Sequence, residues 1–300
     1  MLSITPNALS TAQEPLNWTV RELFASPVAR ISLLRCRPDT LKCSCEKCAV
    51  DNQLVFVKRG GFIKHRGKTA QVVNANKAAF FRAGECYKTS HVDPGGDACI
   101  VFSFSDHVVP RRLLDTLPGD AACAAVTPAV VGHALRVAAD PLSEPMAVEE
   151  SAIALLERAL PATPQSASAR GPARAVIRDI EAALTADPSA KWSLAGLSRQ
   201  FRRNPFYVSR SFRATTGFPL HRYLLNLRLA SAAARLTDGE ENLAALAFDL
   251  GFSSHSHFSA AFRASLGMSP RQFRRVAQGR PADRRAELIK KLKAPKILRP

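Results

Sequence analysis

No apolar run in this 300-residue chain approaches the ~20 residues that a membrane-spanning helix needs. The stretch from Met1 to Pro15 contains no basic segment followed by an apolar one, so we expect no signal peptide. These two absences predict a soluble cytoplasmic protein that has no membrane partner. The seven cysteines are then expected to be mostly reduced, as thiols are in the cytoplasm.

Acidic residues are scarce in the C-terminal part of the chain. Residues 1–170 hold 19 Lys and Arg against 16 Asp and Glu, a balance of +3. Residues 171–300 hold 23 against 9, a balance of +14. Such asymmetry favours a polyanionic partner for the C-terminal part, although a merely solvated basic surface has the same composition.

This basic part twice contains a pattern of two short helices joined by a tight turn. The first copy predicts a helix over Ser193–Phe201, a turn at Arg202–Asn204 and a second helix over Pro205–Thr216. Asn204 is a good N-cap, a proline fits the first helical position, and Gly217 is a typical helix stop.

The second copy predicts a helix over Leu243–Leu250, a turn at Gly251–Ser253 and a helix over His255–Ser265. A helix pair with so short a turn is the unit that places one helix in the DNA major groove, so double-stranded DNA is the predicted partner. Between the copies, Pro219–Leu236 has apolar residues at helical spacing. We expect this rigid helix to hold the two units about one DNA turn, ~34 Å, apart.

Once the positions at the helix-helix contact are buried, a largely polar set of side chains, together with Phe206, is left facing outward on the second helix of each unit. The predicted DNA-binding residues are Phe206, Ser209, Arg210, Arg213, His255, Ser256, Ser259 and Arg263. Arg210 can donate two hydrogen bonds to guanine, whereas Arg213 and Arg263 are better placed for phosphate. Ala260 stands at the position that matches Arg210, so the second unit is expected to discriminate bases less sharply and to depend on DNA shape.

The N-terminal part has a different rhythm, with short β-type segments between turn signals. The expected strands are Arg30–Arg35, Leu54–Lys58, Gly61–His65, Thr69–Val73, Ala78–Phe81, Tyr87–His91 and Cys99–Phe104. This spacing is typical of a small barrel or a double-sheet jelly roll. A helical apolar stripe over Met146–Leu160 is suited either to packing on the barrel or to a dimer seam.

The fold class expected is therefore α+β and multidomain, with a β-rich, cupin- or jelly-roll-like N-terminal domain and an all-α C-terminal domain of two helix-turn-helix subdomains. We place a sensor and dimerisation domain at residues 1–160 and a Pro- and Ser-rich linker at 161–172. The DNA-binding domain then spans 173–276 and a basic tail 277–300. Each of the two domains is expected to have its own core.

The C-terminal part resembles the AraC/XylS family of bacterial transcriptional regulators over about Val176 to Arg275. The most specific stretch runs from Gly251–Ser253 through Phe258 and Phe262-Arg263 to Gly267–Pro270 and Phe273-Arg274. The resemblance implies seven helices, binding to promoter DNA beside RNA polymerase, and usually activation. It places Phe206, Ser209, Arg210, His255, Ser256 and Ser259 against the bases. Members often carry Arg or Lys where this chain has Ala260.

The N-terminal part resembles the cupin-type sensor domains of many such regulators, in segments such as Phe80–Tyr87 and Pro94–Asp97. This likeness implies an unidentified small-molecule or metal effector and a homodimer. Enzymatic cupins bind metal through a His-x-His pair, whereas His65 and His91 stand alone in this sequence. We therefore expect no catalytic metal site, no catalytic residues and no cofactor, and thus a protein that is not an enzyme.

Cysteines gather in one short stretch, where Cys43, Cys45 and Cys48 follow Cys36. Three or four thiolates can bind Zn²⁺ or another soft metal, so a metal-responsive or redox-responsive regulator is an open alternative. The spacing is not that of a structural zinc ribbon, and cysteines without any ligand explain it equally well. The remaining cysteines, Cys86, Cys99 and Cys123, are expected to be small core residues.

Two other functions are ranked lower. A DNA repair methyltransferase of the adaptive-response type joins cysteine-bound zinc to a similar helix-turn-helix module. Its acceptor cysteine lies in a Pro-Cys-His-Arg setting, and this chain has neither that tetrapeptide nor any cysteine after Cys123. An architectural DNA binder without sequence preference is the other alternative, and Arg210 on a well-formed recognition helix argues against it.

Overall fold

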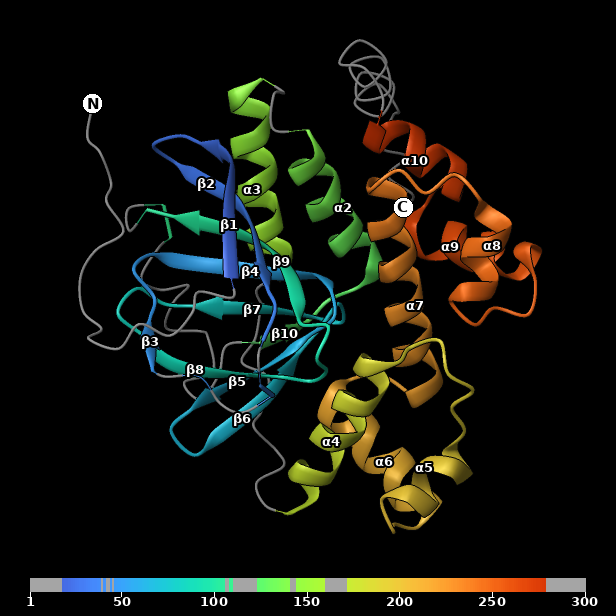
Figure 1. Cartoon of the computed structure of the whole chain (residues 1–300). Coiled ribbons are helices and arrows are strands. Elements are labelled where there is room, and N and C mark those ends of the chain that lie inside the picture. The colour runs from blue at the N-terminus through green and yellow to red at the C-terminus, as the bar shows by residue number, and fades with distance from the viewer. Residues whose placement is uncertain are drawn as a thin grey trace, which may run out of the picture.

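The computed structural model describes residues 18–38, 40–41, 44, 46–105, 108–109, 123–140, 144–159 and 172–278. Strands dominate up to residue 125 and helices follow from residue 128 (Figure 1). We call residues 18–159 the N-terminal region and residues 172–278 the helical region. Leu160, residues 161–171 of the predicted 161–172 linker and residues 279–300 of the predicted tail lie outside the described residues, and Pro172 already begins a helix.

Two antiparallel sheets form the N-terminal region. The first has the order β1 (Trp18–Ala25), β2 (Ala29–Cys36), β9 (Asp97–Phe104), β4 (Asn52–Arg59), β7 (Lys77–Phe81) and β10 (Cys123–Ala125). The second has the order β3 (Lys47–Cys48), β8 (Cys86–His91), β5 (Phe62–Arg66) and β6 (Thr69–Val73). All seven strands expected from the sequence are present, and β1, β3 and β10 are additional.

Alternating side chains of the larger sheet enter two different cores. On β4, Leu54 and Phe56 face one core, while Val55 and Val57 face the other. This is the period-2 geometry of a strand that is covered on both faces. The second core lies between the two sheets and includes Phe62 of β5 and Phe81 of β7. The double-sheet architecture expected for this region is confirmed.

Two helices cover the other face of the larger sheet (Figure 1): α2 (Pro128–Ala139) and α3 (Pro145–Ala159). The apolar stripe of α3 is buried there through Val148, Ala152, Leu155 and Leu156. These four residues therefore pack on the sheet, as one of the two interpretations of the stripe predicts, while Met146 and Ile153 are exposed.

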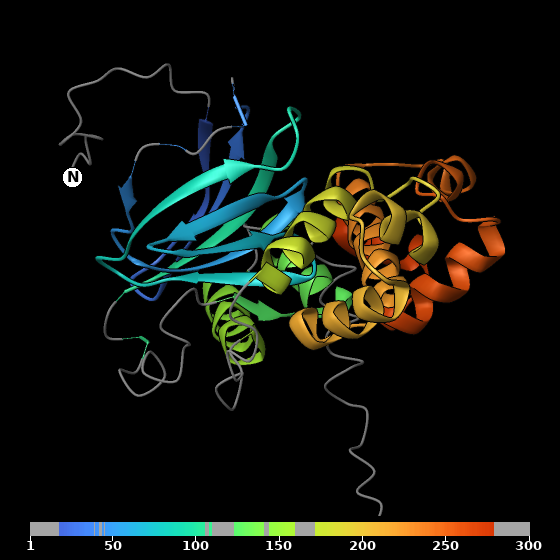
Figure 2. The ribbon, with the colours of Figure 1, turned by 90° about the horizontal axis from the view of Figure 1, so that it is seen from below.

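The helical region consists of seven helices within the described residues. They are α4 (Pro172–Ala186), α5 (Leu194–Gln200), α6 (Pro205–Thr216), α7 (Leu220–Thr237), α8 (Leu243–Asp249), α9 (His255–Leu266) and α10 (Pro270–Gln278). In Figures 1 and 2 they lie together on one side of the sheets. None of the described helices is long and apolar enough to cross a bilayer.

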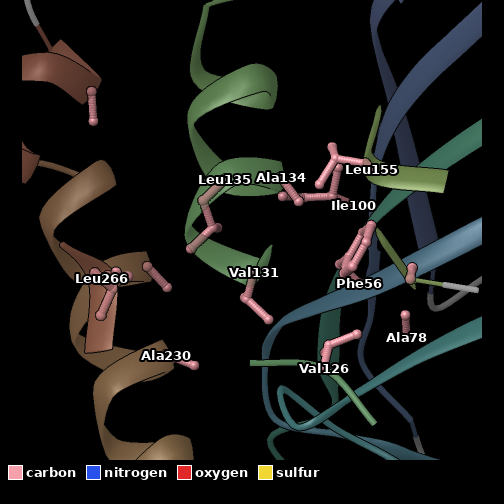
Figure 3. Close-up of a cluster of buried hydrophobic side chains, with 14 of the residues drawn as sticks. Phe56, Ala78, Ile100, Val126, Val131, Ala134, Leu135, Leu155, Ala230 and Leu266 are labelled. Atoms are coloured by element: carbon pink, nitrogen blue, oxygen red, sulfur yellow. The ribbon is translucent and has the colours of Figure 1, made fainter. Parts of the chain in front are cut away.

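The cores do not follow the expected division into two independent units. A separate core joins α4, α5 and α6 to the first half of α7. The core of α8, α9 and α10, however, is continuous with that of α2 and the larger sheet (Figure 3). Val131 and Leu135 of α2 lie between Phe56 of the sheet and Ala230 and Leu266 of the helical region. The expectation of separate cores is therefore wrong for the second helix pair.

Candidate nucleic-acid interface

In the first helix pair, α5 and α6, the ends of α6 are capped as its sequence predicts. Asn204 accepts a 2.8 Å hydrogen bond from the Phe206 amide at the start of α6, beside Pro205. Gly217 ends α6 in the left-handed conformation, with a φ of 79°. The predicted cap, first-turn proline and glycine stop are confirmed. Inside the pair, the residues that face one another, Leu197, Val208 and Phe212, are fully buried.

The second pair, α8 and α9, repeats this construction with different residues. Asn242 caps α8 and Ser254 caps α9, each accepting a backbone hydrogen bond, of 3.0 and 3.1 Å. Phe258 and Phe262 of α9 are fully buried, and the ring of Phe262 lies edge-on to that of Phe273 in α10, with 5.6 Å between centroids. The buried face of α9 is thereby fixed, and its opposite face is turned to solvent.

The predicted DNA-binding residues occupy the outer faces of α6 and α9. Seven of them are exposed: Phe206, Ser209, Arg210, Arg213, His255, Ser256 and Arg263. Phe206 is 72% exposed, so its side chain is not part of the core. Ser259 is half-buried, with its Oγ 3.4 Å from Nε2 of His255. Contact of these residues with DNA stays a prediction.

A basic hollow beside Arg263 was not anticipated from the sequence. Its volume is about 630 Å³, and Arg271, Arg274 and Arg275 of α10 line it together with Arg263. The Arg274 guanidinium donates to the carbonyls of residues 240 and 241, at 3.2 and 2.9 Å, so it is tied to the loop before α8. Arg263 and Arg271 are exposed at the hollow, where they can bind a phosphate. The run Arg271–Arg275 was the sequence signal for this site.

The spacer helix α7 has 18 residues and is therefore about 27 Å long. The predicted continuous helix is confirmed. The two helix pairs lie toward opposite ends of α7 (Figure 1). Arg228, from the middle of α7, donates to the carbonyls of Pro188 at 2.7 Å and Gly251 at 2.8 Å. One guanidinium thus joins the loop before α5 to the turn of the second pair.

The N-terminal region contacts this assembly near each of the two helix pairs. Near the first pair, the turn between β6 and β7 inserts Asn74, whose amide donates to the Tyr223 hydroxyl at 2.7 Å. Burial, with the nearby Glu181 carboxylate, raises the pKa of Tyr223 well above its usual value, so the hydroxyl stays protonated. Near the second pair, α2 packs so closely that a Cβ added at Gly132 would lie 2.9 Å from a methyl group of Leu266.

The cysteines are arranged differently from what we expected. Cys48 of β3 and Cys86 of β8 lie directly opposite each other and form a disulfide. The expectation that the thiols are mostly reduced is therefore wrong for this pair, and Cys86 is exposed rather than a core residue. Because its sulfur is bonded to Cys86, Cys48 is not a free metal ligand beside Cys43 and Cys45, which lie outside the described residues.

Among the described residues, three further cysteines, Cys36, Cys99 and Cys123, are free thiols. Cys99 is buried between the sheets and Cys123 packs against the same core, as expected for small core residues. Cys36 lies beside His91 and Asp97, three residues that are separated in the sequence. Hydrogen bonds to Asp97 and Cys36 raise the pKa of His91 to about 9. His65 lies apart from them, with its Nε2 2.7 Å from Oγ of Ser90.

Comparison with known proteins finds a known domain type in the helical region. Residues 197–276 match the model of a helix-turn-helix domain. A putative AraC-like transcription regulator from Streptomyces antibioticus is 29% identical over 187 residues, which are 58% of this chain and 61% of that protein. The transcriptional activator RhaS from Escherichia fergusonii is 40% identical over 75 residues, 25% of this chain and 26% of that protein. The chain thus matches less than two thirds of the length of either relative.

Solved structures with a likeness to this chain include ToxT from Vibrio cholerae, which is 10% identical with a TM-score of 0.36, over 88% of this chain and 100% of that one. The C-terminal domain of AraT, a response regulator from Geobacillus stearothermophilus, is 25% identical with a TM-score of 0.31. That likeness covers 35% of this chain and 85% of the AraT chain. At TM-scores this low, neither structure bears on the assignment. It rests on the domain match and the two named relatives: residues 197–276 are a helix-turn-helix domain, and the chain is similar to AraC-like transcription regulators.

Proposed function

We propose that this protein is a sequence-specific DNA-binding transcriptional regulator that reads promoter DNA with α6 and α9 in successive major grooves. The observation that carries the proposal is the exposure of Arg210 and its neighbours on a capped helix whose other face is fully buried. A fixed helix presents its side chains to base edges at low entropic cost, which is the requirement for direct readout.

The two units have different tasks in this proposal. On α6, the exposed Arg210 reads a guanine, while Arg213 binds phosphate one turn further along the helix. On α9, the exposed Ala260 offers no such contact. The second unit therefore depends on His255 and Ser256 and on phosphate contacts from Arg263 and the basic hollow.

Regulation in this proposal runs through the two attachments between the regions. An effector bound in the N-terminal region shifts the population of arrangements in which Asn74 holds Tyr223 and α2 holds α9. The partners are promoter DNA, RNA polymerase, a small-molecule or metal effector and a second copy of the chain. The protein works without catalysis in the cytoplasm, with a sensor domain over 1–160, a linker over 161–172, a DNA-binding domain over 173–276 and a basic tail over 277–300.

Sequencing of the genomic DNA fragments bound by the purified full chain tests this function. The proposal predicts a shared motif of two half-sites about one helical turn apart, the second more degenerate than the first. Binding that is sensitive to salt but enriches no motif would contradict it and would favour an architectural DNA binder. A charge-matched control, Arg21→Ala on the exposed face of β1, should enrich the same motif as the unmodified chain.

A further inference from the structure

Three different metal-ligating side chains converge at one end of the two sheets. Cys36 is the last residue of β2, His91 the last of β8 and Asp97 the first of β9. Their ligand atoms all lie within 4.8 Å of one another, and Nε2 of His91 is 2.9 Å from Oδ1 of Asp97. Asp97 is buried, with 3% of its surface exposed, and the other two are half-buried. We call these residues the Cys36–His91–Asp97 cluster.

The backbone is built to bring these residues together. Antiparallel pairing of β2 with β9 sets Cys36 directly opposite Asp97. The turn from β8 to β9 crosses between the sheets and contains Gly96, whose φ is +70°. A Cβ at Gly96 would lie 2.0 Å from the carbonyl oxygen of Cys36, so only glycine permits this approach. The close packing fixes the position of Cys36 relative to both partners.

The cluster forms part of the wall of a cavity between the sheets. The cavity has a volume of about 220 Å³, and its wall includes the apolar side chains of Leu34, Val55, Phe81 and Val101. A pocket that is mostly apolar, with a few convergent polar groups at one place, is the usual form of a ligand site. An ion held by the three side chains would have its remaining coordination position beside this space.

We propose that Cys36, His91 and Asp97 bind a zinc-class divalent cation at the edge of this cavity. A thiolate, an imidazole and a carboxylate together select Zn²⁺ or a similar borderline ion, because Mg²⁺ and Ca²⁺ take oxygen ligands. Three protein ligands leave a position open to water or to an effector. This site differs from the cysteine stretch at Cys43, Cys45 and Cys48, and it does not depend on the DNA-binding function.

Cys99 has a positioning role at this site. Its Sγ donates a 3.1 Å hydrogen bond to Oδ2 of Asp97, so Oδ1 remains directed toward His91. Such outer partners fix the orientation of metal ligands. Without a cation, His91 and Asp97 form an ion pair, and a bound cation would take the place of the proton between them.

Titration of the purified full chain with Co²⁺, a spectroscopic stand-in for Zn²⁺, tests the proposal. We expect one equivalent to bind with a thiolate-to-cobalt charge-transfer band that Zn²⁺ abolishes. Cys36→Ala should remove the band, and His91→Ala should weaken binding by at least about 100-fold. Cys99→Ala should weaken it by about tenfold, through the loss of the Asp97 partner alone.

Three control variants separate this site from other thiols and from loss of folding. The variant with Cys43 and Cys45 both changed to Ser, which keeps the Cys48–Cys86 disulfide, should keep the band, since neither residue belongs to the cluster. Cys123→Ala and His65→Ala should also keep it. The proposal is wrong if the unmodified chain binds no stoichiometric Co²⁺, if the variant at Cys43 and Cys45 loses the band, or if Cys36→Ala retains it.

Discussion

Asn74 and Tyr223 are joined by a 2.7 Å hydrogen bond from the Asn74 side-chain amide to the tyrosine hydroxyl. The first belongs to the turn between two strands and the second to the spacer helix α7, so this bond connects the two regions of the molecule. The Tyr223 hydroxyl donates in turn to Glu181 at 3.0 Å, and Glu181 pairs with Lys77 at 2.6 Å. This network is almost fully buried, so a movement of the turn between β6 and β7 would shift or break its hydrogen bonds to α7.

Tyr223→Phe tests the strength of this connection. The change leaves one amide hydrogen of Asn74 without its buried acceptor and takes a donor from Glu181, while the ring remains packed on Phe212. We expect the free energy of unfolding of the full chain to fall by about 1–3 kcal/mol in urea denaturation. The half-buried Tyr207 of α6 provides the control, since Tyr207→Phe should cost less than half as much. Equal losses in the two variants would contradict a special role for the Tyr223 hydroxyl.

Substitutions in the turns of the two helix pairs should change the free energy of unfolding in opposite directions. Arg202 is left-handed with a φ of 51°, a conformation that glycine adopts without strain. Arg202→Gly should therefore raise the free energy of unfolding by up to about 1 kcal/mol.

Gly251 occupies the matching turn position, with a φ of 77°, and a Cβ there would lie 2.5 Å from the carbonyl oxygen of Ser189. Gly251→Ala should lower the free energy of unfolding by about 1–3 kcal/mol, as a strained left-handed backbone does. Thermal and urea denaturation of both variants measure whether the free energy of unfolding rises in Arg202→Gly and falls in Gly251→Ala. A neutral Gly251→Ala would show that the turn is not held against Ser189.

Arg210 and Arg213 should have separable effects on DNA binding. Arg210→Ala should relax the preference at one or two base positions, by about 1–3 kcal/mol, and leave most non-specific affinity intact. Arg213→Ala should weaken binding to all sequences and reduce the slope of log K against log salt concentration by about one. Affinities measured for operator variants over a range of salt concentrations distinguish them. Unchanged relative affinities in Arg210→Ala would mean that α6 does not read bases.

The disulfide gives a direct chemical prediction. Alkylation of the denatured, unreduced chain, followed by peptide mapping, should label Cys36, Cys99 and Cys123 and leave Cys48 and Cys86 unlabelled. Reduction before alkylation should add label to those two. Because the bond closes a 38-residue separation, its reduction should lower the free energy of unfolding by about 2–4 kcal/mol. Alkylation of Cys48 and Cys86 without reduction would contradict the bond.

Local chemistry explains what could be predicted from the sequence. The helix pairs were found because caps such as Asn204 and stops such as Gly217 act within one turn of the residues they serve. The seven expected strands were found because alternation within each segment signals its faces. By contrast, β1 has mostly exposed residues, and β3 and β10 have 2 and 3 residues, so each is defined by the strand it pairs with.

Features that depend on contacts between distant residues were missed. His91 has no partner within its own segment, and its association with Cys36 follows from the pairing of β2 with β9. The role of α2 was missed for the same reason, since its helical pattern does not say that Gly132 packs on Leu266. For the recognition helices, the sequence predicted which side chains face outward but gave no sign that Arg228 ties the two units together.

A spacing test examines the central claim, that α7 and Arg228 hold two recognition helices for successive major grooves. The measurement compares the affinity of the full chain for its selected operator with that for a copy carrying about five extra base pairs, half a helical turn, between the half-sites. The account predicts a loss of at least about tenfold, because the second unit can no longer reach its groove. Equal affinities for the two DNAs would contradict it.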